Sequence, residues 1–176
     1  MVQKNTDNIP SNSTRDVALD AIDRKILGEL ANDASQSFAS LGQTVGLSAP
    51  AVHERVKRLR ARGAIRKTVA MLDGKSVGKG LLAFVHVDTT GWGKTPGIME
   101  LAKLPEVEEI HSSTGDTCLI MKLRVSSSEA LEGLLSKLYD TDGVRSTRTY
   151  VALSTHIERG VQAGISSELE NGGGVR

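Results

Sequence analysis

Residues 48–63 carry the pattern that most constrains how this chain can fold. Ser48 is a favoured helix N-cap, because its hydroxyl can accept a hydrogen bond from an N–H of the first turn. Pro50 falls within that turn, where a missing N–H removes no helical hydrogen bond. Gly63 can adopt the left-handed conformation that ends a helix. The face predicted to pack inward, at helical spacing, consists of Val52, Val56, Leu59 and Gly63.

The other faces of this predicted helix are basic. Residues 53–67 contain seven lysines and arginines and one acidic residue, Glu54. A short basic helix with a polar N-terminus and a narrow apolar face suits the major groove of DNA. A solvated surface is the alternative use of the same pattern, so the interpretation depends on what precedes the helix.

Two helices are predicted ahead of it, over about 19–33 and about 37–45. Only Gly46 and Leu47 separate the second of them from Ser48. Helices joined by so short a connection cannot lie antiparallel over a shared length, and they must cross steeply. This arrangement is typical of a helix-turn-helix, whose second helix enters the groove.

The start of the basic helix is expected to approach DNA bases, because its side chains are short, and the cations are expected to reach phosphates. Residues 64–73 are β-prone and predict a wing-like strand segment with two cations near its start. The predicted DNA-binding residues are Ser48, Ala49, Pro50, Ala51, His53, Glu54, Lys57, Arg58, Arg62, Arg66 and Lys67.

The second half predicts the element order βαββαβ, with strands over 81–88, 107–112, 118–125 and 144–153. The helices between them are expected over 96–104 and from Ser127 or Ser128 to near Gly143. The predicted class is therefore α+β, with an N-terminal winged helix-turn-helix domain and a C-terminal ferredoxin-like domain. The expected organisation is a disordered N-terminal tail (1–17), a helix-turn-helix domain (18–73), a linker (74–80), a βαββαβ effector-binding and oligomerisation domain (81–158) and a flexible C-terminal tail (159–176).

Charge distribution and composition narrow the function. Residues 19–67 hold nine basic and five acidic side chains, whereas residues 80–160 hold eight basic and eleven acidic, so only the first half suits a polyanion. Aromatic residues make up 3% of the chain, which disfavours stacking on single-stranded nucleic acid. One cysteine permits no intrachain disulfide, and no signal sequence or membrane span is apparent, so a cytoplasmic protein is expected. Without paired catalytic groups or metal-ligand spacing, neither an enzyme nor a metal site is expected.

These motifs resemble the Lrp/AsnC family of transcription regulators. The resemblance rests on the segments Leu19–Leu27, Val45–Pro50, Glu54–Leu59, Ser113–Asp116 and Thr147–Val151. It implies a sequence-specific DNA-binding regulator of amino-acid metabolism, working at the bacterial nucleoid. The pattern is also compatible with the actinobacterial members that control alanine dehydrogenase. The resemblance further implies a homodimer that assembles into higher oligomers, with an octamer expected, and dimers would favour imperfect palindromic operators in double-stranded DNA.

The resemblance also implies a free amino acid as effector, bound near a Gly-Asp turn, with no other cofactor. Gly115 has a structural alternative as a turn residue, and Asp116 has one as a turn cap. The family's turn commonly reads Gly-Asp-x-Asp, but Cys118 occupies the last position here. This departure keeps a second function open, an architectural DNA-wrapping protein without an effector. The predicted effector-binding residues are Ser113, Thr114, Gly115, Asp116, Thr117, Cys118, Tyr150, Ala152 and Ser154.

Overall fold

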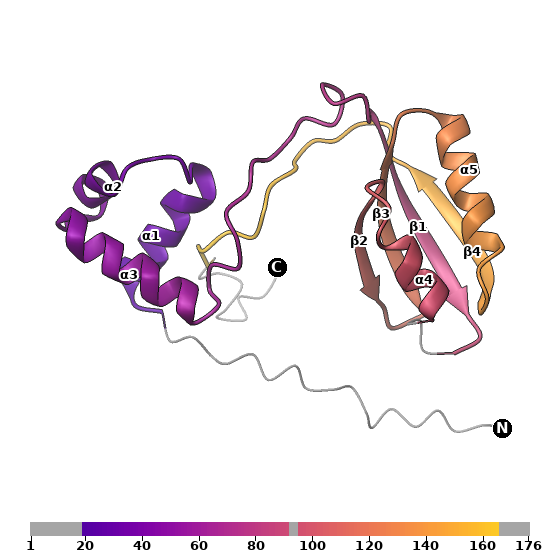
Figure 1. Ribbon diagram of the computed structural model, residues 1–176, viewed down its shortest axis with the longest axis horizontal. Coiled ribbons are helices and arrows are strands. Elements are labelled where there is room, and N and C mark those ends of the chain that lie inside the picture. Colours follow the sequence, from indigo (N-terminus) through magenta and orange to yellow (C-terminus); the bar gives the residue numbers. More distant parts are fainter. Residues whose placement is uncertain (1–18, 92–94, 166–176) are drawn as a thin grey trace, which may run out of the picture. The chain divides into compact units, whose positions relative to one another are not determined.

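The computed structural model of the chain describes residues 19–91 and 95–165. The predicted N-terminal tail and the end of the predicted C-terminal tail lie outside this range. The described residues divide into two compact units, one formed by residues 19–69 together with 159–165 and the other by the described part of Ala70–Glu158 (Figure 1). The chain therefore passes from the first unit into the second and then returns. Within the described residues, no helix is long and apolar enough to cross a membrane.

The first unit is a three-helix domain in which side chains cap the first two helices. The Asp20 carboxylate accepts a hydrogen bond from the Asp23 N–H (2.7 Å), and the Ser37 hydroxyl accepts one from the Ser40 N–H (3.1 Å). The helices are α1 (Ala21–Asn32), α2 (Phe38–Val45) and α3 (Ala49–Ala61), as the periodicity predicts. Their apolar faces meet in one core of Ile26, Leu41, Val52, Val56 and Leu59.

Gly63 ends α3 in the left-handed conformation, with φ of +81°. The Gly63 N–H donates to the Arg60 carbonyl (3.0 Å), and the Ala64 N–H donates to the Leu59 carbonyl (2.9 Å). The prediction that Gly63 also lies on the inward face is wrong, since Gly63 is exposed. The helical path stops at Arg62, so the helical spacing no longer applies to the next residue.

The predicted wing strand is absent, because residues 64–73 contain no strand. Their composition favours extended backbone, but a strand also needs a partner for its N–H and C=O groups. Within the described residues, all strand pairing lies in one sheet, which begins at Leu81. Val69, Met71 and Leu72 are consequently exposed.

The second unit has the predicted βαββαβ order. Its elements are β1 (Leu81–Thr89), α4 (Pro96–Leu101), β2 (Val107–Ser112), β3 (Leu119–Val125), α5 (Ser128–Tyr139) and β4 (Val144–Val151). The strands form one antiparallel sheet in the order β2-β3-β1-β4. The helix α4 is shorter than predicted, because the chain tightens into i→i+3 turns after Leu101, with the Leu104 N–H donating to the Leu101 carbonyl (3.0 Å).

The helices α4 and α5 cover one face of the sheet (Figure 1). The core between them contains, among others, Val85, Val87, Ile98, Leu119, Met121, Leu123, Leu134 and Leu138. The opposite face carries cross-strand neighbours of mixed character, including Phe84 opposite Tyr150 and His86 opposite Arg148. Phe84 is 38% exposed and Tyr150 is 53% exposed, so this open face leaves aromatic surface uncovered within the chain.

Candidate nucleic-acid interface and effector loop

The connection between α2 and α3 depends on close backbone contact. Gly46 takes a left-handed conformation with φ of +74°, and the Leu47 N–H donates to the Gly42 carbonyl (2.8 Å). A Cβ added to Gly42 would lie 2.5 Å from the Leu47 carbonyl oxygen. The steep crossing of the two helices therefore requires glycine at position 42. Sequence reasoning missed this residue, whose only signal is a glycine inside a short helix that needs no turn there.

The outer surface of α3 carries most of the predicted DNA-binding side chains. Ser48 and Pro50 at its start are exposed, while Ala49 and Ala51 are half-buried. The exposed side chains further along and just beyond the helix are His53, Glu54, Lys57, Arg58, Arg60, Arg62, Arg66 and Lys67. The helix thus presents cations outward while its apolar stripe packs inward.

The hydroxyl of Ser48 does not cap α3, contrary to prediction. Ser48 is the N-cap residue, and its carbonyl accepts the first helical hydrogen bond from the Val52 N–H (3.0 Å), but its side chain makes no capping hydrogen bond. An N-cap side chain usually bonds to the N–H of the second or third helical residue. Pro50 is the second residue and has no N–H, which removes one of these two donors.

Arg55 is a cation of α3 that does not face outward. Its Nη1 lies 2.6 Å from Oδ2 of Asp20 and 2.7 Å from Oδ1 of Asp23 in the first turn of α1, and its side chain is 21% exposed. The hydrogen bond from Arg55 holds the pKa of Asp20 below its usual value, and the same bond raises the pKa of Arg55. These two ion pairs, the Arg55 clamp, fix α3 against α1 and withdraw one positive charge from the exposed surface.

Two further contacts shape the exposed surface of α3. The ring of His53 packs edge-on against Phe38 of α2, with centroids 5.4 Å apart and an interplanar angle of 64°. The carboxylate of Glu54 lies 3.9 Å from Nζ of Lys57, one helical turn away. The first contact orients His53 from a neighbouring helix, and the second offsets part of the charge of Lys57.

The predicted effector loop, Ser113–Cys118, connects β2 to β3. The Ser113 N–H donates to the Cys118 carbonyl (3.0 Å), and the Cys118 N–H donates to the Val87 carbonyl (3.1 Å). Thr117 is buried, with its hydroxyl 3.2 Å from the Val87 carbonyl oxygen. Gly115 has φ of +112°, and an added Cβ would meet no atom within 4 Å. Thr117 therefore holds the base of the loop, whereas Gly115 borders open space.

Arg148 of β4 binds the tip of this loop. Its Nη1 donates to Oδ2 of Asp116 (3.0 Å), and its Nη2 donates to the main-chain oxygen of the same residue (3.2 Å). The hydrogen bond lowers the pKa of Asp116 and raises the pKa of Arg148. Sequence reasoning placed Arg148 in a family motif but gave it no role, because 32 residues separate it from Asp116.

Other predicted effector residues lie farther from the loop. Tyr150 is two residues from Arg148 on the same strand, and its ring packs edge-on against His86 at 5.1 Å. The Ala152 N–H instead donates to the Leu82 carbonyl (2.9 Å). Leu82 lies near the start of β1, about 17 Å along the strand from Val87, whose carbonyl binds the base of the loop. Ser154 is exposed and follows Ala152. One chain therefore brings the loop into contact with Arg148, with Tyr150 two residues farther along β4, whereas Ala152 pairs at the far end of β1.

Cys118 lies at the edge of the apolar core of the second unit. It is half-buried, packs against the apolar core, and its Sγ lies 4.0 Å from the Thr89 carbonyl oxygen. Its side chain contributes to packing at the base of the loop.

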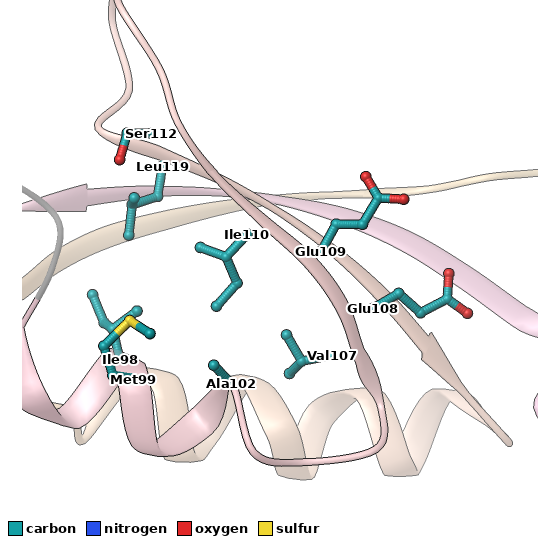
Figure 2. Close-up of a pocket in the computed structure, with 9 residues that line it drawn as sticks. All are labelled: Ile98, Met99, Ala102, Val107, Glu108, Glu109, Ile110, Ser112 and Leu119. Atoms are coloured by element: carbon teal, nitrogen blue, oxygen red, sulfur yellow. The ribbon is translucent and has the colours of Figure 1, made fainter. Parts of the chain in front are cut away.

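A groove of about 250 Å³ lies between α4 and β2 (Figure 2). Ile98, Met99 and Ile110 give it an apolar lining. Glu108 and Glu109 stand at one side, but Glu108 binds Arg124 (2.6 Å) and Glu109 binds His111 (2.9 Å). These carboxylates are already paired, so the groove is a poor site for the ammonium group of an amino acid.

Each of the two structural units matches a known protein domain. Residues 19–60 match the AsnC-type helix-turn-helix domain, and residues 82–162 match the Lrp/AsnC ligand binding domain. The chain belongs to the Lrp/AsnC family of transcriptional regulators. Each family domain falls on one structural unit, the first on α1–α3 and the second on the four-stranded sheet with its helices.

Individual Lrp/AsnC relatives cover most of the chain. The HTH-type transcriptional regulator FL11 of Pyrococcus horikoshii is 35% identical over 142 residues, covering 81% of this chain and 94% of the relative. The leucine-responsive regulatory protein of Salmonella typhimurium is 38% identical over 141 residues, covering 77% of this chain and 85% of the relative. These relatives are named as regulators and not as enzymes.

A solved structure shares the architecture. A transcriptional regulator of Neisseria meningitidis, solved as a complex with L-Met, superimposes with a TM-score of 0.74 at 26% identity and covers 80% of this chain and 94% of that chain. This Lrp/AsnC chain therefore combines a DNA-binding helix-turn-helix with a ligand-binding domain. Among residues 19–91 and 95–165, no group of three or more His, Cys, Asp or Glu side chains could hold a metal ion.

Proposed function

We propose that this Lrp/AsnC regulator inserts α3 into the major groove of imperfect palindromic operators and that a small amino acid modulates this binding. The observation that carries the proposal is the division of charge on α3. Arg55 is neutralised by two aspartates, while Lys57, Arg58 and Arg62 are exposed. The inner cation stabilises the domain, and the outer cations remain available to phosphates.

The start of α3 supports base contact. Ser48 and Pro50 are exposed, and the Ser48 hydroxyl is not used for capping. His53 is oriented by Phe38 on the same exposed surface. Small or pre-oriented side chains at the N-terminal end of a recognition helix suit contact with base edges. Arg66 and Lys67 follow the helix and add phosphate contacts.

The open sheet face supports a homodimer. Phe84 exposes aromatic surface there, and such surface favours burial against a second copy. Two recognition helices in one dimer account for palindromic operators. Association of dimers, up to an octamer, extends this assembly. Light scattering of the full chain at micromolar concentration tests it, and a monomer would contradict the dimer.

The effector is proposed to be a free amino acid bound at the loop Ser113–Cys118. The Neisseria relative was solved with L-Met, and the loop offers open space at Gly115 beside the charges of Asp116 and Arg148. The effector acts by favouring one assembly, and hence one spacing of recognition helices, over another. The protein is proposed to work in the cytoplasm at the bacterial nucleoid, where its DNA targets lie, and to act there without enzymatic activity.

The test is a fluorescence-anisotropy titration of operator DNA with and without each of the twenty amino acids. We expect tighter binding to palindromic operators than to scrambled DNA, and a change in affinity or footprint with at least one amino acid. Equal binding to all DNA sequences would contradict the operator proposal.

An architectural DNA-wrapping role is the second candidate function. It is favoured by Cys118, which replaces the family's usual Asp and packs against the core. In that case no amino acid changes the DNA affinity, and the footprint grows with protein concentration regardless of sequence.

A further inference from the structure

The ion pair between Asp116 and Arg148 joins the tip of the effector loop to β4. We propose that an α-amino acid binds by inserting into this ion pair, with its carboxylate on Arg148 and its ammonium group on Asp116. This inference rests on the proposed amino-acid effector and names the charged groups that recognise it. Arg148 then acts as a specificity-determining residue, and the intact pair is the unliganded state of the site.

The geometry of Arg148 suits a carboxylate. Its guanidinium already uses two nitrogens, Nη1 and Nη2, to bind two oxygens of Asp116, one from the side chain and one from the main chain. The two oxygens of a free carboxylate match this planar fork in the same way. Asp116, once released, presents a carboxylate that can accept hydrogen bonds from an ammonium group.

The exposure of the pair allows a ligand to open it. The side chain of Asp116 is 82% exposed and that of Arg148 is 45% exposed. Exposed ion pairs contribute little to stability, so opening this one costs little. A zwitterion also leaves neither charge without a partner, whereas a simple amine or a simple acid would compensate only one of the two.

The surroundings leave room for the rest of the ligand. An added Cβ at Gly115, next to Asp116, would meet no atom within 4 Å. Tyr150, 53% exposed and two residues from Arg148, offers an aromatic surface for an apolar side chain. The edge-on contact with His86 orients that ring. The site therefore suits an amino acid with an apolar side chain.

Insertion also explains how occupancy changes the protein. Arg148 binds the main-chain oxygen of Asp116 as well as its carboxylate, so it restrains the backbone at the loop tip. A ligand carboxylate that takes over the guanidinium removes this restraint. The loop can then move relative to β4, which links ligand binding to the conformation of the ligand-binding domain.

The experiment is isothermal calorimetry on the full chain with three probes. They are the L-amino acid that binds tightest in a screen of twenty, the amine left by its decarboxylation, and the acid left by loss of its ammonium group. For the wild type we expect each truncated probe to bind at least about tenfold more weakly than the amino acid. In Arg148→Gln the amino acid and the amine should bind with similar affinity. In Asp116→Asn the amino acid and the deaminated acid should do so.

Matched variants separate recognition from structure. Lys103→Gln removes an exposed ion pair with Glu100 (2.7 Å) in α4 and should leave all three affinities unchanged. Arg148→Lys keeps the charge without the planar fork and should retain part of the preference for a carboxylate. Thermal melts verify that each variant is folded.

Different results would contradict the amino-acid effector and its insertion between Asp116 and Arg148. If the wild type binds no amino acid, the proposed effector is wrong and the insertion model falls with it. If the wild type binds an amino acid but Arg148→Gln weakens all three probes by the same factor, the ion pair is only structural. That result would overturn the insertion model and leave the amino-acid effector in place.

Discussion

The guanidinium of Arg55 in α3 donates a 2.7 Å hydrogen bond to the carboxylate of Asp23 in α1. Asp23 is buried, and the same guanidinium also binds Asp20, the N-cap of α1. The proposed recognition helix is thereby fixed at its inner side by charge as well as by apolar packing. The cations of α3 therefore have two roles. Arg55 on the inner face stabilises the domain, whereas exposed cations such as Lys57 and Arg58 remain available to DNA.

Replacing Arg55 by methionine should lower the thermal stability of the first unit, by about 5 °C in Tm. The variant loses both ion pairs of the clamp and leaves the buried carboxylate of Asp23 without its cation. Arg60→Met, at an exposed position of the same helix, is the control and should melt like the wild type. Equal melting of the two variants would contradict a stabilising clamp.

The clamp also predicts a pH dependence. Arg55 lowers the pKa of Asp20 in the folded state, so this carboxylate stabilises the fold above its unfolded pKa, and that stability is lost as pH falls through the folded value. The difference in Tm between wild type and Arg55→Met should therefore be largest near neutral pH and shrink below about pH 4. Melting curves across this range check the sign. A difference that grows on acidification would contradict it.

Lys57→Ala and Arg58→Ala should weaken DNA binding without unfolding the protein, because both side chains are exposed. Each lost phosphate contact should reduce the slope of log affinity against log salt by about one unit. Lys137→Ala, an exposed change in α5 of the other unit, should leave affinity and slope unchanged. Wild-type slopes in both α3 variants would mean that another surface binds DNA.

Gly42→Ala should destabilise the helix-turn-helix by about 1–3 kcal/mol, because its Cβ would lie 2.5 Å from the Leu47 carbonyl oxygen. Gly28→Ala is the matched control, since nothing lies within 4 Å of an added Cβ in the middle of α1. Alanine favours a helix over glycine, so this control should gain about 0.5–1 kcal/mol. Denaturant unfolding measures both changes, and a gain in the two variants alike would refute the close contact.

Gly115→Thr should lower amino-acid affinity by at least about tenfold. The added side chain occupies the open space beside Asp116 and forces a β-branched residue into φ of +112°. Gly78→Thr carries the same kind of backbone strain, at φ of +76°, outside the loop and should keep the wild-type affinity. Calorimetry distinguishes the two, and wild-type affinity in folded Gly115→Thr would remove the loop from the effector site.

Cys118→Asp should reduce the free energy of unfolding by about 1–3 kcal/mol, because a carboxylate would replace a thiol that packs against the core. Cys118→Ser, which keeps the size of the side chain, should cost less. Restoring the family's usual Asp would strengthen the amino-acid response only if this position faced the ligand. A stable Cys118→Asp protein with higher amino-acid affinity would show that the side chain turns toward the site.

Sequence patterns spanning a few residues were sufficient to predict most of the helices and strands. Apolar spacing, the Gly46–Leu47 connection and the terminal Gly63 predicted the three helices of the first unit, and alternating apolar residues predicted the strands of the second. These signals work because helix ends and strand faces depend on residues only a few positions apart. The same logic overpredicted the strand at 64–73, where extended backbone was favoured but no partner strand was available.

The sequence by itself determined the order of the elements, the basic surface of α3 and the polar loop after β2. Only the tertiary structure decided which charges are paired, since Arg55 meets Asp23, and Arg148 meets Asp116, across 32 residues of chain in each case. It also decided that the half-buried Cys118 packs against the core and that Ala152 lies at the far end of β1 from the loop. Periodicity specifies the face on which a side chain lies, but its partner depends on which elements the fold brings together.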